Sequence, residues 1–276
     1  MGLISSERPV VLVGAGKMGG AMLTGWLKDG RSGQEFVILD PMLADEMKDL
    51  VANDGVRHFV AMPDDLMPSI VIIAVKPQMM DAVLPKIAAS KNLDAAAFVS
   101  VAAGTSVATF QSHFGAEAAI VRAMPNTPSQ VGRGITIGYP TSAVSAEQKV
   151  AIAELLEVTG GFDWVDREAL IDAVTAVSGS GPAYVFHMVE AMAAAGEKAG
   201  LSPELALRLA RATVEGAGEL LYQSDLDAGT LRKNVTSPGG TTAAALDVLM
   251  DDEGLTSLMT KAVDAAKARA EELGRA

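Results

Sequence analysis

Two glycine-rich segments of this chain carry residue types suited to holding anionic groups. The first, GAGKMG at residues 14–19, follows an apolar β-branched run at 9–13 and precedes a helical pattern. In a dinucleotide-binding turn, Gly14 permits the turn, Gly16 lets a pyrophosphate approach the backbone, and Gly19 lets helix and strand pack closely. The free N–H groups at the helix start then face the phosphates. The spacing predicts cofactor binding at Gly14, Gly16, Lys17, Met18 and Gly19.

The second segment, VTSPGGTT at residues 235–242, places two glycines and two hydroxyls directly before a helical pattern. Backbone N–H groups and the helix dipole at such a helix start form an anion site, and a carboxylate fits it without an arginine. The same residues would also serve as a plain turn with an N-cap. The spacing leaves both interpretations open.

Two charged residues stand at the ends of predicted strands. Asp40 ends the strand pattern at 34–40, at the interval expected of a ribose-binding carboxylate, and it would repel a 2′-phosphate. Asp40 therefore favours NADH over NADPH, although an Asp that only caps the turn at Pro41 has the same pattern. Lys76 follows the strand pattern at 69–75, where ligands of open α/β sheets bind. A cofactor contact and a solvated lysine fit it equally.

These residues need a sheet to position them, and strand patterns alternate with helical ones in the first part of the chain. The pattern predicts an edge strand at Gly134–Tyr139, a last strand at Phe162–Val165, and a helix capped by Thr105. From about residue 166 the strand signal disappears. The sequence therefore predicts an α/β Rossmann dinucleotide-binding domain over residues 1–165, followed by an all-α C-terminal dimerisation domain over residues 166–276.

The helical part is poor in bulky side chains. One helix is expected at Glu168–Val177, broken by SGSGP at 178–182, and a later helix contains AMAAAG at 191–196. Helices with such small side chains pack closely against other helices. Five or so of them form a modest bundle, so we expect the remaining apolar surface to be buried in a homodimer. The alternative is a self-contained helical domain.

Composition excludes several classes of function. The net charge of −12 argues against nucleic acid and against an anionic membrane surface as partners. The absence of cysteine excludes thiolate chemistry, and His58, His113 and His187 lie in no catalytic or metal-binding motif, so no metal site is expected. We see no secretory signal and no membrane span, so a cytoplasmic protein is expected. A cofactor must supply the reactive atom, as in hydride transfer to a protonated imine.

Six motifs occur in an order that points to one family. Over nearly its whole length the sequence resembles the pyrroline-5-carboxylate reductases. The resemblance implies reduction of Δ1-pyrroline-5-carboxylate to L-proline with NAD(P)H, the last step of proline biosynthesis. It also implies a helical domain that interlocks with its twin, in dimers that often assemble into rings of five, a decamer. The motifs are VGAGKMG at 13–19, AVKPQ at 74–78, SVAAG at 100–104, RAMPNTP at 122–128, SGSGPAYVF at 178–186 and VTSPGGTT at 235–242.

The resemblance assigns roles by position. Thr242 is expected to be catalytic, because it would hydrogen-bond the ring nitrogen during direct hydride transfer from the nicotinamide. Because the carboxylate loop comes from the helical domain, the active site is expected between subunits. Substrate contacts are expected at Ser237, Gly239, Gly240, Thr241, Thr242 and Asn126. Further cofactor contacts are expected at Ala74, Val75, Lys76, Pro77, Ala103, Gly104, Met124 and Pro125.

Two departures from the family pattern concern the adenosine side. Asp40 replaces the small polar residues of NADPH-preferring members, and Ala61-Met62-Pro63 falls where many members offer an Asn. Two alternatives to this family remain open. A β-hydroxyacid dehydrogenase or a broad imine reductase would carry a catalytic Lys or Asp in the first interdomain helix, and the start of 183–198 has no such Lys. A non-enzymatic redox sensor would need neither the SPGGTT nor the MPNTP loop.

Overall fold

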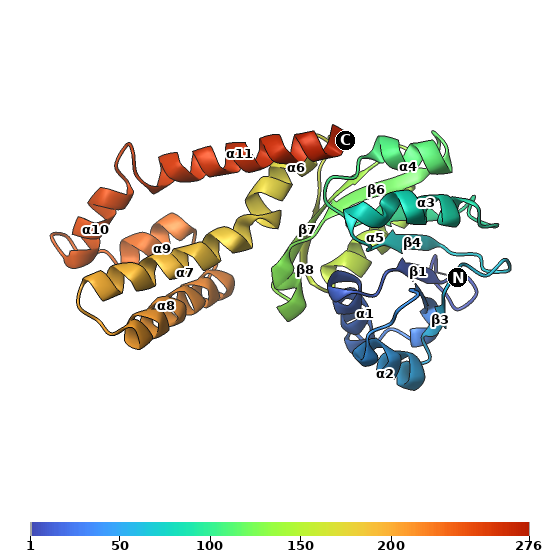
Figure 1. Ribbon diagram of the computed structural model, residues 1–276, viewed down its shortest axis with the longest axis horizontal. Coiled ribbons are helices and arrows are strands. Elements are labelled where there is room, and N and C mark those ends of the chain that lie inside the picture. The colour runs from blue at the N-terminus through green and yellow to red at the C-terminus, as the bar shows by residue number, and fades with distance from the viewer. Residues whose placement is uncertain (1, 276) are drawn as a thin grey trace. The chain divides into compact units, whose positions relative to one another are not determined.

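The computed structural model describes residues 2–275, with side chains for residues 2–274, and it contains two compact units. The first unit runs up to Gly179 and also takes in the end of the chain from Ala266 onward. The second unit is Ser180–Ala265. The strands end at Trp164, whereas the first unit continues through the next helix (Figure 1).

The first unit is built on a single sheet with the strand order β3-β2-β1-β4-β5-β6-β7-β8. From β1 the chain passes to β2 and β3 on one side and then to β4 on the other. Such a reversal of strand order opens a crevice at the carboxyl ends of the strands, as in a Rossmann fold. The strands are β1 (Val10–Val13), β2 (Phe36–Leu39), β3 (Arg57–Phe59), β4 (Ile70–Ile73), β5 (Ala97–Ser100), β6 (Ala119–Met124), β7 (Gly134–Pro140) and β8 (Gly160–Trp164).

The strand β7 lies inside the sheet, so the prediction that it forms an edge is wrong. It pairs antiparallel with β6 and parallel with β8, and β8 is the edge. Buried positions in β7 alternate with partly or fully exposed ones, which an inner strand of a sheet also allows. The rings of Phe162 and Trp164, 4.7 Å apart and edge to face, pack over Gly138.

Helices cover both faces of the sheet, and a buried apolar cluster lies on each face. Trp26 of the first helix stacks on Phe36 at 4.8 Å and donates its indole N–H to the carbonyl of Leu155 at 2.6 Å. Trp26 therefore links its helix to the helix that contains Leu155 by a hydrogen bond, and to the strand that begins at Phe36 by ring stacking. The helices are α1 (Lys17–Lys28), α2 (Asp45–Asp54), α3 (Met80–Ala88), α4 (Val107–Phe114), α5 (Ala146–Glu157) and α6 (Leu170–Val174).

Two helix boundaries differ from the sequence prediction. Ser106, not Thr105, caps α4, because its hydroxyl accepts the N–H of Thr109 at 3.3 Å. The helix expected at Glu168–Val177 begins later and changes to a π-helical turn at Thr175–Gly179. Ile171 and Ala176 of this segment are both buried. The change from α-helical to π-helical geometry therefore occurs where the segment packs against the interior.

The second unit is all-helical. It contains α7 (Gly181–Lys198), α8 (Pro203–Gln223), α9 (Ala228–Asn234), α10 (Thr241–Leu249) and the start of α11 (Leu255–Arg275). Small residues form the contact between α7 and α8, where a Cβ on Gly196 would lie 3.2 Å from the Cβ of Ala206. Large apolar side chains on these two helices are exposed. Among the described residues, no helix has both the length and the apolar character needed to cross a membrane.

The end of α11 belongs to the first unit. Ala270 is buried there, and the Cβ of Leu273 lies 3.3 Å from the point where a Cβ on Gly104 would stand. Gly104 has φ of +73°, a conformation that favours glycine. The last turns of the chain therefore cover the loop that follows β5.

Candidate active site

The glycine-rich turn between β1 and α1 has one glycine that packing does not require. Gly14 has φ of +89°, and a Cβ there would lie 2.9 Å from Val75 Cγ1. A Cβ on Gly19 would overlap the carbonyl oxygen of Gly14. A Cβ on Gly16 would meet nothing within 4 Å. The fold therefore needs Gly14 and Gly19, whereas the space beside Gly16 is open to a ligand.

The start of α1 offers free hydrogen-bond donors beside that space. No side chain caps the helix at Gly16, and the first backbone bond runs from the N–H of Gly20 to the carbonyl of Gly16. Among the described residues, the amides of Lys17, Met18 and Gly19 therefore have no acceptor. A helix start with unused N–H groups binds phosphate. The turn fits the pyrophosphate of a dinucleotide.

Asp40 is fixed by backbone donors from two sides. Its Oδ2 accepts the N–H of Ala15 at 2.9 Å, and its Oδ1 accepts the N–H of Met42 at 2.8 Å. Its carbonyl oxygen lies 2.7 Å from Nε2 of His58. Asp40 thus caps the turn after β2 and also anchors the glycine-rich turn. Each carboxylate oxygen keeps a lone pair for a ribose hydroxyl, and within the described residues no ion pair neutralises the charge.

The other predicted cofactor residues follow β4, β5 and β6. These strands run parallel to β1, so their carboxyl ends meet at the edge that holds the glycine-rich turn. The turn lies close to the end of β4, because a Cβ built on Gly14 would stand 2.9 Å from Val75 Cγ1 and 3.2 Å from the carbonyl carbon of Ala74. Lys76 is exposed, and Pro77 begins a 3₁₀ turn.

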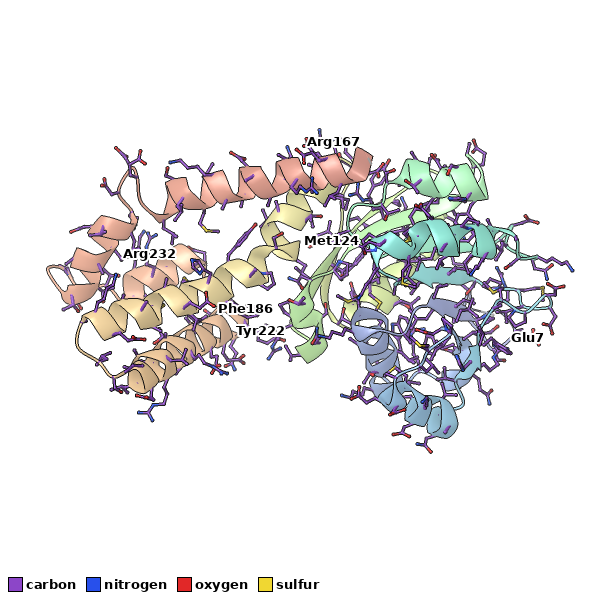
Figure 2. The ribbon with its side chains drawn as sticks, in the orientation of Figure 1. Glu7, Met124, Arg167, Phe186, Tyr222 and Arg232 are labelled. Atoms are coloured by element: carbon purple, nitrogen blue, oxygen red, sulfur yellow. The ribbon has the colours of Figure 1, made fainter. Side chains whose placement is uncertain are left out.

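The side-chain amide of Asn126 is held in one orientation by a hydrogen bond to β7. Its Oδ1 accepts the N–H of Ile135 in β7 at 3.0 Å, which fixes the orientation of the side-chain amide. The half-buried Nδ2 therefore remains as a donor at the end of β6. Met124, which is labelled in Figure 2, and Pro125 precede it.

The second predicted anion site lies in the second unit, at the start of α10. Gly239 has φ of +70°, and Gly240 is an N-cap without a side-chain hydrogen bond. Thr241 and Thr242 are the first two residues of the helix rather than part of the loop. In the described part of the chain, neither of their amides has an acceptor, and the hydroxyls of Ser237, Thr241 and Thr242 are also unbonded. This helix start is open to a carboxylate.

Sequence reasoning missed a buried charge cluster next to the nucleotide edge. Arg122 in β6 is 5% exposed, and its guanidinium pairs with Glu168 at 3.2 Å and with Asp172 at 2.8 Å. The signal in the sequence is a single arginine inside the apolar strand AIVRAM. In the residues that the structure describes, no three His, Asp or Glu side chains are arranged to hold a metal.

Comparisons with known proteins agree with this geometry. A family model described as pyrroline-5-carboxylate reductase dimerisation matches residues 168–273, and one described as NADP oxidoreductase, coenzyme F420-dependent, matches residues 9–104. A pyrroline-5-carboxylate reductase from Pseudomonas aeruginosa is 37% identical over 266 residues, which cover 96% of each chain. The chain belongs to the pyrroline-5-carboxylate reductase family. The family that the motifs predicted, and the fold class, are therefore confirmed.

Solved pyrroline-5-carboxylate reductases share the whole architecture. The structure from Coxiella burnetii is 32% identical with a TM-score of 0.85, and the match covers 97% of this chain and 98% of that one. The structure from Plasmodium falciparum, with NADP bound, is 28% identical with a TM-score of 0.77 and coverage of 98% and 99%. A reductase of this family uses a nicotinamide cofactor, and the open turn beside Gly16 fits the pyrophosphate of one.

Proposed function

We propose that this protein reduces Δ1-pyrroline-5-carboxylate to L-proline with NAD(P)H, the last step of proline biosynthesis. The observation that carries the proposal is the 37% identity to a pyrroline-5-carboxylate reductase across 96% of both chains, since it spans both candidate anion sites. We assign cofactor binding to a domain of residues 1–165. Substrate binding and dimerisation are assigned to residues 166–276, a division at the change of composition rather than at Gly179.

The bound cofactor supplies the hydride, and the chain has to hold it. The free amides at the start of α1 and the open space at Gly16 would take the pyrophosphate. Ala74–Pro77 and Ala103–Gly104 would contact the rest of the cofactor. Met124, Pro125 and Asn126 would line the nicotinamide side of the pocket. Asp40 would accept hydrogen bonds from the ribose hydroxyls, and its unpaired charge would disfavour a 2′-phosphate. We therefore propose NADH as the preferred cofactor, although a relative contains NADP.

The substrate would be held by its carboxylate. The unbonded amides of Thr241 and Thr242 and the exposed hydroxyl of Ser237 can bind it, because Gly239 and Gly240 leave the helix start bare. The Thr242 hydroxyl would hydrogen-bond the ring nitrogen and, directly or through a water that it orients, handle the amine proton as product forms. Asn126 would contribute a donor from its oriented amide.

Assembly is the next part of the proposal. The exposed side chains of Phe186, Leu220 and Tyr222, at 66%, 63% and 63%, leave α7 and α8 with apolar surface that a second copy would cover. We propose a homodimer, with pentamers of dimers as the larger assembly. The active site would then combine the α10 loop of one subunit with the cofactor edge of another. A cytoplasmic location is proposed on the sequence alone.

The test is a direct assay at 340 nm. Protein, NADH and pyrroline-5-carboxylate are mixed, and the expected result is loss of absorbance with formation of L-proline. Turnover of other imines in preference would indicate a broad imine reductase, and oxidation of a β-hydroxyacid with NAD⁺ would indicate that dehydrogenase class. Cofactor binding without turnover of either substrate would support a redox sensor. The first turns of α7 contain neither Lys nor Asp, which favours the first outcome.

A further inference from the structure

Arg122 and Met124 lie two residues apart on β6, so their side chains are on the same face of the sheet. The segment from α6 to its π-helical turn packs along that face. Arg122 Nη2 binds Asp172 at 2.8 Å, and seven residues further along, a Cβ on Gly179 would lie 2.5 Å from Cε of Met124. The ion pair therefore sets where the π-helical turn meets Met124.

Arg122 also reaches the loop after β5, through a second carboxylate. Glu168 Oε1 lies 3.2 Å from Arg122 Nη1 and accepts the N–H of Val107, the first residue of α4, at 2.8 Å. A carboxylate at a helix N-terminus is stabilised by the helix dipole. The loop after β5 runs through Ala103 and Gly104 to the N-cap Ser106, so this contact fixes the end of that loop.

The cluster is fixed because the charge is buried. Arg122 is 5% exposed and among the described residues its Nε has no acceptor, so Glu168 and Asp172 supply the side-chain hydrogen bonds that compensate its desolvation. Apolar residues of similar volume often give equal stability at such a site. What the ion cluster adds is a defined arrangement of three segments: β6, the start of α4, and α6.

We propose that Arg122 is a positioning residue for hydride transfer. Through Asp172 it holds the turn Thr175–Gly179 against Met124, and through Glu168 it holds the loop Ala103–Gly104. The proposed function puts the cofactor at both places, with its nicotinamide beside Met124, so this inference rests on that function. Loss of either carboxylate would let one wall of the nicotinamide site move, while the glycine-rich turn and its phosphate contacts stay intact.

The test compares Asp172→Asn and Glu168→Gln with a control, Glu154→Gln. Glu154 pairs with Arg31 at 3.3 Å in the same unit. In the described residues its side chain makes no hydrogen bond or ion pair with the loop Ala103–Gly104 or with the turn Thr175–Gly179. We expect both test variants to lose about tenfold or more in kcat, since small displacements of reacting groups are costly. Their affinity for NADH should stay near that of the parent protein. Their deuterium isotope effect on kcat, measured with NADH deuterated at C4, should rise as hydride transfer becomes slower. The control should change none of these quantities.

A purely structural role would give a different result. Fewer folded molecules would lower the apparent kcat without changing the isotope effect, and that outcome would overturn the inference, as would unchanged kinetics. Hydrogen exchange on the cofactor-free protein gives a second readout. Asp172→Asn should speed exchange at residues 175–179 and Glu168→Gln at residues 103–107, with residues 14–19 unchanged. Because exchange needs no turnover, an inactive parent protein would contradict the proposed function while this readout still decides the role of Arg122.

Discussion

Replacing Gly16 by alanine should separate cofactor binding from folding. A methyl group at this position meets nothing within 4 Å, and the backbone there, with φ of −72° and ψ of −158°, is open to any residue. The unfolded chain loses some freedom when glycine becomes alanine, which stabilises a protein by about 0.4–1 kcal/mol where the conformation is compatible. The cofactor-free variant should therefore melt at the temperature of the parent protein or slightly above it.

The cost should appear only when the cofactor binds. The new methyl group would stand where a pyrophosphate approaches the first amides of α1. A hydrogen bond to a charged group contributes roughly 1.5–3 kcal/mol, so the loss of one weakens binding roughly tenfold to hundredfold. At a cofactor concentration of about 100 times the parent Kd, binding stabilises the parent by about 2.7 kcal/mol. A tenfold weaker variant would gain only about 1.4 kcal/mol at that concentration.

Thermal melts with and without NADH, together with fluorescence titration of NADH, measure both effects. Gly161→Ala in β8 is the matched control, since its methyl group would meet only Ile135 at 3.9 Å, and its affinity for NADH should match that of the parent. Gly19→Ala should lower stability even without cofactor, because its Cβ overlaps the carbonyl of Gly14. A Gly16→Ala protein that binds NADH as tightly as the parent would refute the assignment of the pyrophosphate to this turn.

Three further predictions concern single side chains. Thr242→Ala should lower kcat by about a hundredfold, whereas Thr242→Ser should keep most activity and both should bind NADH normally; unchanged turnover in the alanine variant would remove Thr242 from the mechanism. Asp40→Asn should raise the ratio of kcat/KM for NADPH over NADH by about tenfold, because a repulsive charge is removed; a parent enzyme that already prefers NADPH would contradict this. The Thr230 hydroxyl donates to the Asp227 carboxylate and holds its pKa below the ordinary value of 3.8. The cap on α9 is therefore complete above that value and lost as pH falls through the lowered pKa, so amide exchange in α9 should accelerate there, and Asp227→Asn should show no such acceleration.

Local sequence patterns predicted the fold because each strand and turn carries its own signal. The G-x-G-x-x-G turn needs Gly14 and Gly19 for packing within a few residues, and such requirements are visible in sequence. The position of β7 was not visible, because the residue types within a strand do not report which strands pair with it. Whether β8 pairs with the outer side of β7 depends on how the whole chain folds, and not on the residues of β7 alone.

The same limit applies to the site. Asp40 could be predicted as a ribose ligand or as a turn cap, but its bond to Ala15 depends on the pairing of β1 with β2. The carboxylates that pair with Arg122 lie 46 and 50 residues along the chain, so no local pattern identifies them. A charged residue within a buried strand signals only that partners must exist.

The return of α11 to the first unit has a consequence for how the protein is made. Leu273 covers the loop at Gly104 but lies far along the chain from it, so it leaves the ribosome long after the strands of the sheet. Domains generally fold as units during synthesis, starting from the N-terminus. Here the first unit can form its sheet early, yet it stays incomplete at one corner until α11 has been synthesised. A chain that stops before Ala266 would therefore keep its sheet and leave the loop at Gly104 uncovered.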